Sequence, residues 1–570
     1  MTAYRSLKAI PLSSLILLLS FMPGCAPAAS GQSTVAKASS ELPPCLPDQL
    51  LARVPDPEEL ETHRQFELPA IDYPAGTEKR IWGLSVTLRV DENGVPVCHK
   101  LSERFGDEVP LDDQRKAFIG QLAGWRYTPL TRDGQAVPMI VTETVREEEL
   151  LEKHVPMPAV PLSQVRIVLT RSGCFGMCPN YSVELRGDGS VLYTGQSFVD
   201  VEGEHRYQVP VREVAALVES ARAKDLWSMR PSYRARITDH PTYGLTFDMG
   251  GQIHRIEDYV GRAVGMPAVI SEFQDEVDKV ARTEMWVALS NEGIDHLQQA
   301  GFDFDSQEGA NLLGRAVAND HGHDDAAMVR LISLGAPIHG AEPSGWSQGA
   351  GRPSLIESAL RHRRPDLIEP LVAAGALDND GVLGQDKIDA AFRAAIEGGN
   401  LEAVEKIWNV AGTERRPSLT FVDEVETPNG KSISKQVPVT LLLSKGYMPN
   451  PEWQGLAIAR WLVARGCDVK ASDADGDTLL HVAAGADEPE FVRYLLDQGL
   501  DASAGGQFGL PPLGSAGDED VALLLLEAGT DLRMMGDGGE HFMDYARSNH
   551  WGRVLAWLQQ AGVTPPAKKN

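Results

Sequence analysis

The chain has 570 residues, with 53 lysines and arginines against 80 aspartates and glutamates, which gives a formal net charge of −27. This acidic balance argues against sequence-independent binding to nucleic acid and against adsorption to anionic lipid, because both depend on basic surface. The length allows about three or four domains. A hydrophobic content of 42% is typical of a folded chain. We therefore expect a protein or a small ligand as the partner.

The N-terminus has the pattern of an export signal. Arg5 and Lys8 precede an apolar run over residues 12–22, which is too short and too early for a membrane-spanning helix of the mature protein. The run ends in "FMPGC", which resembles a bacterial lipobox and implies cleavage before a lipidated Cys25. We predict a signal peptide over residues 1–24 and a lipid anchor with a flexible linker over 25–45. The alternative is ordinary cleavage a few residues later.

The export signal also predicts the compartment and the state of the cysteines. No later apolar run is long enough to span a membrane, so we expect the chain in the periplasm, held at the outer membrane only by its lipid. Disulfides form in that oxidising compartment. If Cys25 is lipidated, an odd number of cysteines remains, so at least one has no partner within the chain. The remaining cysteines are Cys45, Cys98, Cys174, Cys178 and Cys467.

A small α+β domain is predicted over residues 46–150. Apolar residues alternate over 84–90, turn residues follow, and a second strand is expected near 95–101. A helix begins at Leu111, and a last strand lies near 137–145. "LRVDENGVP" and "WRYTPLTRDGQAVP" resemble the C-terminal domain of TonB energy transducers. The chain has neither a transducer's uncleaved anchor nor its proline-rich spacer, so the resemblance implies a fold reused for binding.

The first domain also contains a candidate disulfide. Cys45 precedes the domain, and Cys98 lies in its second predicted strand. A bond between them would tie the N-terminal segment to the sheet under oxidising conditions. Two unrelated thiols are the alternative.

A second α+β domain is predicted over residues 160–283. Strands are expected at 165–171 and around 181–185, a helix at 211–223, and further strands at 244–249 and 252–256. The stretches "TRSGCFGMCPNYSVELRGDGSVLYTG" and "TDHPTYGLTFDMGG" resemble a family of mostly secreted bacterial domains that is marked by a CFGxCP motif. That family has no assigned activity, so the resemblance implies a fold and no reaction.

Cys174 and Cys178 of this motif are spaced for a metal site, a redox pair, a nucleophile or a structural disulfide. A zinc site needs about four ligands, and only His240 and His254 could be added to the two cysteines. A thioredoxin-type pair is C-x-x-C, which this is not. The oxidising compartment favours a structural disulfide, with free thiols as the alternative. We therefore predict no metal ligand and no catalytic residue.

From residue 284 to about 564 the pattern changes to paired short helices with a period near thirty. The clearest unit is "DADGDTLLHVAAGADEPEFVRYLLDQGLDAS", which resembles an ankyrin repeat. The resemblance implies a structural role for His481 and a left-handed helix end at Gly499. More degenerate copies bring the total to about eight repeats, with an insertion over 413–436. Cys467 takes a small-residue position, so we expect it to be buried and inert.

We therefore predict a multidomain protein, with two small α+β domains followed by an all-α ankyrin-repeat solenoid. Ankyrin arrays recognise proteins and contain no catalytic constellation. We expect a non-enzymatic periplasmic binding or scaffold protein with no cofactor and no nucleic-acid partner. Loop-tip acids such as Asp475 and Asp477 are candidate partner-binding residues.

Two alternatives remain open. One is an enzyme, or a redox or metal protein, that uses Cys174 or Cys178 with Asp239, His240 or His254. The other is an immunity or inhibitor protein for a periplasmic effector.

Overall fold

A computed structural model describes residues 42–52, 54, 57–74, 84–103, 111–132, 134–151, 153–319, 324–340, 353–426, 432–444, 452–535 and 540–563. The chain divides into residues 1–40 and a compact unit of residues 41–570. Cys25 and the predicted signal peptide lie outside the described residues. Among the residues that are described, no helix has both the length and the apolar composition needed to cross a bilayer.

The N-terminal region of the compact unit is rich in sheet. Its central strand is β2 (Leu84–Val90), which pairs antiparallel with β3 (Pro96–Glu103) and with β6 (Met139–Val145). Helix α2 (Asp113–Ile119) begins where the Asp112 side chain accepts the Arg115 backbone N–H, a normal N-cap. These elements enclose a hydrophobic core of their own. The smaller elements are η1 (Pro47–Leu50), α1 (Pro57–His63), β1 (Ile71–Tyr73), η2 (Leu122–Gly124), β4 (Leu130–Arg132), β5 (Gln135–Val137) and β7 (Glu147–Glu149).

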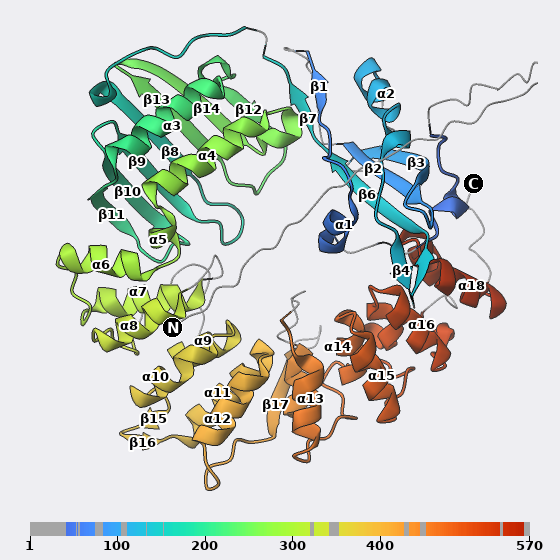
Figure 1. The fold of residues 1–570 in the computed structure, drawn as a ribbon. Coiled ribbons are helices and arrows are strands. Elements are labelled where there is room, and N and C mark those ends of the chain that lie inside the picture. Colours follow the sequence, from blue (N-terminus) through green and yellow to red (C-terminus); the bar gives the residue numbers. More distant parts are fainter. Residues whose placement is uncertain are drawn as a thin grey trace, which may run out of the picture. The chain divides into compact units, whose positions relative to one another are not determined.

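A seven-stranded sheet follows, with strand order β11-β10-β9-β8-β13-β14-β12. All neighbours are antiparallel except β12 and β14. Helices α3 and α4 cover one face (Figure 1). Val165, Ile167 and Leu169 alternate with less buried residues, so one face of β8 lies in the core. The elements are η3 (Leu162–Gln164), β8 (Val165–Arg171), β9 (Asn180–Arg186), β10 (Ser190–Ser197), β11 (Gly203–Gln208), α3 (Val211–Ala223), η4 (Leu226–Ser228), β12 (Ser232–Arg234), β13 (Tyr243–Met249), β14 (Gln252–Tyr259), η5 (Gly261–Val264) and α4 (Ala268–Ala281).

The C-terminal region is helical, and its helices follow one another in pairs. In two pairs a short 3-10 helix replaces the first α-helix. In η9, Pro511 is the N-cap and Pro512 is the first helical residue, a position that suits proline because its N–H would have no partner in the helix. The pairs are α5 (Glu284–Val287) with α6 (Asn291–Gln299), α7 (Gln307–Ala318) with α8 (Asp325–Ser333), α9 (Leu355–Arg361) with α10 (Ile368–Ala373), α11 (Gln385–Gly398) with α12 (Leu401–Val410), η7 (Val439–Ser444) with α13 (Gly455–Val463), α14 (Leu479–Gly485) with α15 (Pro489–Asp497), η9 (Pro512–Ser515) with α16 (Glu519–Glu527), and α17 (Glu540–Ser548) with α18 (Gly552–Gln560).

Three short segments complete this region. The antiparallel hairpin of β17 (Thr420–Glu426) and β18 (Ser432–Pro438) lies largely in the insertion expected over 413–436 and extends beyond its end. A smaller hairpin joins β15 (Asp378–Asn379) to β16 (Val382–Leu383). Two further 3-10 turns are η8 (Gln507–Gly509) and η10 (Leu532–Met535), and η6 (Pro365–Leu367) leads into α10.

One continuous hydrophobic core runs from the seven-stranded sheet into the helical pairs. It includes Val165 of β8, Phe273 of α4, Trp286 of α5 and residues as far along the chain as Leu558 of α18. The predicted boundary at residues 283/284 therefore falls inside a shared core. Because the sheet and the first helical pairs pack directly on each other, we expect them to be thermodynamically coupled.

Candidate functional site

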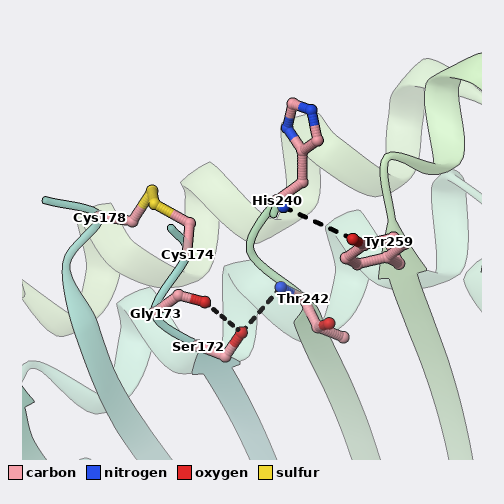
Figure 2. The surroundings of a disulfide bond; sticks show 7 residues. All are labelled: Ser172, Gly173, Cys174, Cys178, His240, Thr242 and Tyr259. Carbon is pink, nitrogen blue, oxygen red and sulfur yellow. Dashed lines mark hydrogen bonds between the residues drawn. A yellow bond between two sulfur atoms is a disulfide. The ribbon is translucent and has the colours of Figure 1, made fainter. Parts of the chain in front are cut away.

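Cys174 and Cys178 are joined by a disulfide, with 5.6 Å between their Cα atoms. The loop they close, called the clip below, follows β8 directly (Figure 2). Gly176 inside the loop has φ of 153°, a conformation open to glycine but rarely to other residues. The Ser172 hydroxyl accepts the Thr242 backbone N–H at 2.8 Å and so fixes the base of the clip against the start of β13.

The histidines that could have served a catalytic cysteine do not assemble with the clip. His240 lies on the neighbouring loop, where its backbone N–H donates to the Tyr259 hydroxyl at 3.5 Å and its side chain is exposed (Figure 2). Tyr243 is the residue of β13 nearest the clip, because it pairs with Arg171 at the end of β8. His254 of β14 pairs with Phe247, which lies four residues further along β13. At about 3.3 Å per residue this places His254 about 13 Å from that end. Its ring lies against Trp227, with centroids 5.2 Å apart.

Asp239, the third residue of the enzyme hypothesis, has a structural contact with the clip. Its backbone carbonyl accepts the Phe175 N–H at 3.2 Å. Within the described parts of the chain, no group of three or more His, Cys, Asp or Glu side chains is arranged to hold a metal ion. The clip is therefore a small covalent loop that presents Phe175 and Met177, with side chains 78% and 54% exposed.

The second disulfide joins Cys45 to Cys98, with 4.9 Å between Cα atoms and a sequence separation of 53. Backbone hydrogen bonds support it, since the Cys45 N–H donates to the His99 carbonyl at 2.8 Å. Cys467 remains as a buried free thiol. Burial raises the pKa of that thiol to about 11, so it stays protonated at neutral pH and is a poor nucleophile.

A polar cluster beside the clip was not foreseen from the sequence. Arg171, at the end of β8, donates twice to Asp278 of α4, at 2.8 and 2.6 Å. Asp278 also accepts hydrogen bonds from the Tyr181 and Thr283 hydroxyls, each at 2.8 Å. Burial, followed by the nearby Asp278 charge, raises the pKa of Tyr181, which therefore stays a neutral donor. The cluster holds the C-terminal end of α4 against the sheet.

A surface hollow of about 730 Å³ lies beside this cluster and is lined by residues of α4, α5 and α6. Ligand pockets usually have apolar or aromatic linings with a few converging polar groups. Here most of the lining residues are charged, and two of them, Arg282 and Glu292, form an ion pair at 2.7 Å. The hollow is therefore a weak candidate for a small-molecule site.

The loop between β10 and β11 forms a junction with the helical region. The Asp200 and Val201 backbone N–H groups donate to the carbonyls of Val287 and Trp286, at 3.1 and 3.0 Å. The Trp286 ring stacks on His205 of β11 with centroids 4.6 Å apart. Because these contacts are short and buried, the sheet and the first helical pair are held together firmly.

The Asp200 carboxylate lies at the centre of this junction and is only 2% exposed. Its two oxygens accept the Leu289 backbone N–H at 2.6 Å and the Asn319 amide at 2.7 Å. Arg315 donates to the Asp200 backbone carbonyl rather than to the carboxylate. Burial therefore dominates and raises the pKa of Asp200 to about 6.

His481 of α14 links the α14–α15 pair, the sixth helical pair and called the sixth repeat below, to the segment that follows it. Its Nδ1 accepts the Thr478 backbone N–H at 3.0 Å, so the neutral ring carries its proton on Nε2. Nε2 lies 3.2 Å from the Leu510 carbonyl, to which it donates. The ring is thus part of the framework of the repeats, in agreement with the structural role expected from the sequence.

The two acids predicted to bind a partner differ from each other. Asp475 is exposed. Asp477 is half-buried, and its Oδ1 accepts the Gln507 N–H of the following repeat at 2.9 Å. Asp477 therefore also serves the contact between helical pairs, because its carboxylate accepts a backbone donor, and its assignment to partner binding stays a prediction. Only Asp475 can test binding without disturbing the contact between repeats.

Comparisons with known proteins agree with this division of the chain. Residues 165–281 match the family model described as a domain of unknown function, DUF6438. Residues 452–535 match the model for ankyrin repeats, in three copies. The C-terminal region therefore contains ankyrin repeats, and a DUF6438 domain lies in the middle of the chain.

Individual proteins resemble only parts of the chain. The E3 ubiquitin-protein ligase KEG of Arabidopsis thaliana is 28% identical over 238 residues, which are 37% of this chain and 14% of that protein. The chain thus corresponds to a small part of the ligase's length. The crystal structure of the Bcl-3 ankyrin repeat domain aligns with 41% of this chain and 91% of its own, at 18% identity and a TM-score of 0.24.

Proposed function

We propose that this protein is a binding or scaffold protein of the bacterial envelope, whose ankyrin repeats form a solenoid that recognises a protein partner. The observation that carries the proposal is the ankyrin match over residues 452–535. Two polar side chains of this region serve its framework. His481 and Asp477 both bond to the following repeat. The exposed surface of such an array is therefore left for recognition.

The export pattern supports a periplasmic location, with lipidation of Cys25 and attachment to the outer membrane. Both disulfides are compatible with an oxidising compartment. In this proposal the first domain is a TonB C-terminal-like fold reused for binding, and the CFGxCP domain serves as a rigid base for the repeats. The continuous core between the middle domain and the helices supports that second role.

Affinity capture tests the proposal. The full-length protein, expressed with its own export signal, is isolated from envelopes, and proteins that elute with it are identified. Asp475→Lys changes an exposed charge in the sixth repeat and is expected to weaken capture of the same partner with little change in melting. Leu480→Ala is the matched control for folding, because Leu480 is fully buried and its loss destabilises the repeat.

Two results would contradict the proposal. One is that no protein elutes with the wild type above the level of an unrelated lipoprotein. The other is that the partner is captured equally well by Leu480→Ala after its repeats have lost structure, since binding would then lie elsewhere in the chain. An enzyme at the clip would instead require that Cys174 or Cys178 react with an alkylating reagent before reduction.

A further inference from the structure

Arginine and aromatic side chains gather at the C-terminal ends of α12 and α13. The Arg416 guanidinium lies 4.6 Å from the centroid of Trp408, and the Arg465 guanidinium lies 3.4 Å from that of Trp461. Arg465 also lies 5.6 Å from the Trp408 ring, and the two indoles meet edge to face at 5.3 Å. These four side chains therefore form one continuous cluster across two neighbouring helices.

The cluster extends to a third helix. Arg460 of α13 lies over the ring of Tyr494 in α15, 5.0 Å from its centroid. Helix α12 packs on α13, and α13 packs on α15. We call the six residues Arg416, Trp408, Arg465, Trp461, Arg460 and Tyr494 the arginine-aromatic ladder. All three arginines are exposed, and the three rings are partly exposed.

The arginines of the ladder differ from others in the same repeats. Arg330, Arg361 and Arg553 each make an ion pair, at 2.6 or 2.7 Å, with a nearby carboxylate. Within the described ranges, Arg416, Arg460 and Arg465 have no carboxylate within the 4.0 Å that defines such a pair. Helix α13 contains no acidic residue at all. The three ladder arginines are thus not ion-paired with any residue that the structure describes, on a chain with net charge −27.

Structural hydrogen bonds use only some of the N–H donors of Arg416 and Arg465. Arg416 donates to the Trp408 carbonyl and Arg465 donates to the Trp461 carbonyl, each at 3.0 Å, which satisfies groups in the last turns of α12 and α13. A guanidinium has five N–H donors in a planar fork suited to carboxylates. Contact with an indole ring restricts the movement of the guanidinium, and both arginines are exposed, so donors not used in these bonds are accessible.

We propose that the arginine-aromatic ladder is the docking surface for an acidic, extended segment of the protein partner. This proposal rests on the proposed binding function. Packed helices lie about 10 Å apart, so three of them span about 20 Å. An extended segment rises about 3.3 Å per residue, and about six residues cover that span. Carboxylates on alternate residues would all lie on one face of the segment, and that face would contact the arginines.

The charge of the whole chain favours a peptide over a membrane. A lipid surface presents many anions over an area larger than the ladder, and the excess acidic groups of this protein would be repelled by it. A short segment faces only the local cationic surface. The ladder lies on the second helices of its repeats, so this surface does not depend on the loop tips that carry Asp475.

The test uses the full chain and a fluorescent decapeptide of alternating glutamate and leucine. Binding is measured by anisotropy and by quenching of tryptophan emission, and is expected to weaken as salt is added. The double variant Arg460→Glu, Arg465→Glu should bind at least about tenfold more weakly. Arg533→Glu is the matched control, because it makes the same kind of charge change at an exposed residue outside the ladder. A circular dichroism melt confirms that each variant is folded.

A conservative variant separates stacking from charge. Arg465→Lys keeps the charge but loses the planar fork, so its affinity should fall between those of the wild type and the double variant. The proposal is overturned if the decapeptide does not bind, or if Arg533→Glu weakens binding as much as the double variant. It is also overturned if vesicles of phosphatidylglycerol bind in a ladder-dependent way while the peptide does not.

The same variants distinguish failure of this inference from failure of the proposed function. If the partner captured from envelopes binds the wild type and the double variant equally, the ladder is not its docking surface, while protein recognition by the repeats still stands. If no partner is captured but the decapeptide binds through the ladder, the wider function fails and the surface property remains.

Discussion

The buried Asp200 carboxylate should make the junction between the middle domain and the helical region sensitive to pH. Burial raises the pKa of this group from 3.8 to about 6. A pKa difference of 2.2 units, at 1.36 kcal/mol per unit, corresponds to about 3 kcal/mol. The protonated form is the one favoured in the folded state. The stability it contributes is therefore fully present below the unfolded pKa and is lost as pH rises through about 6.

The replacement Asp200→Asn isolates this effect, because asparagine does not titrate. The asparagine oxygen can still accept the Leu289 N–H, but its amide would face the Asn319 amide, and one hydrogen bond costing about 1 kcal/mol is lost at every pH. The difference in unfolding free energy between wild type and variant should therefore have a constant part and a part that depends on pH. Between about pH 4 and pH 7, the wild type should lose about 3 kcal/mol relative to the variant.

Urea unfolding followed by circular dichroism across this pH range measures the difference directly. Titration of every other group cancels when the two proteins are compared at the same pH. Asp475→Asn is the control, because it makes the same replacement at an exposed position outside the junction. A difference for Asp200→Asn that stays flat across this pH range would show that Asp200 is solvated in the protein and that the junction is open.

Three further outcomes follow from the same structure. Replacing Cys174 and Cys178 with serine should lower the free energy of unfolding by about 2 kcal/mol, and Cys98→Ser should lower it by about 4 kcal/mol, because the two disulfides bridge separations of 4 and 53 residues. Urea unfolding with and without reductant measures both losses, and equal losses would contradict the loop-entropy argument. Leu495→Ala should cost about 2 to 5 kcal/mol in its repeat, with hydrogen exchange rising in α14 to α16 and not in the seven-stranded sheet. Cys25→Ser should release the protein from the membrane fraction, and the lipid prediction fails if fractionation is unchanged and the wild type carries no lipid mass.

Local patterns were enough to predict several elements. Alternating apolar residues predicted β8 over residues 165–171, and a helical period predicted α3 over 211–223, with the same bounds that the structure has. Both patterns depend only on residues close in sequence, so neither needs tertiary information. The clip was foreseen for the same reason, since its two cysteines are separated by 4 residues. The TonB-like resemblance of the first domain remains a prediction.

Other predictions needed contacts that a short window cannot contain. Strand β11 and helix α4 were not expected, and β11 is largely polar, so its pairing with β10 is what makes it a strand. Asp477 has the sequence position of a surface acid, but its partner Gln507 belongs to the next repeat. The contact between Arg465 and Trp461 is local in sequence, but the ladder as a whole is not, because Arg465 also covers Trp408 and Arg460 covers Tyr494 of another helix.

The sequence by itself determined the order of the regions, the period of the repeats and the residues able to form disulfides, because turn chemistry and hydrophobic period are local properties. Only the tertiary structure decided that the middle domain and the first helices share one core. Asp200 meets Leu289 across 89 residues of chain, and the cost of its buried charge depends on what excludes water there. Such burial is a property of the assembled fold, since no single segment can desolvate a side chain by itself.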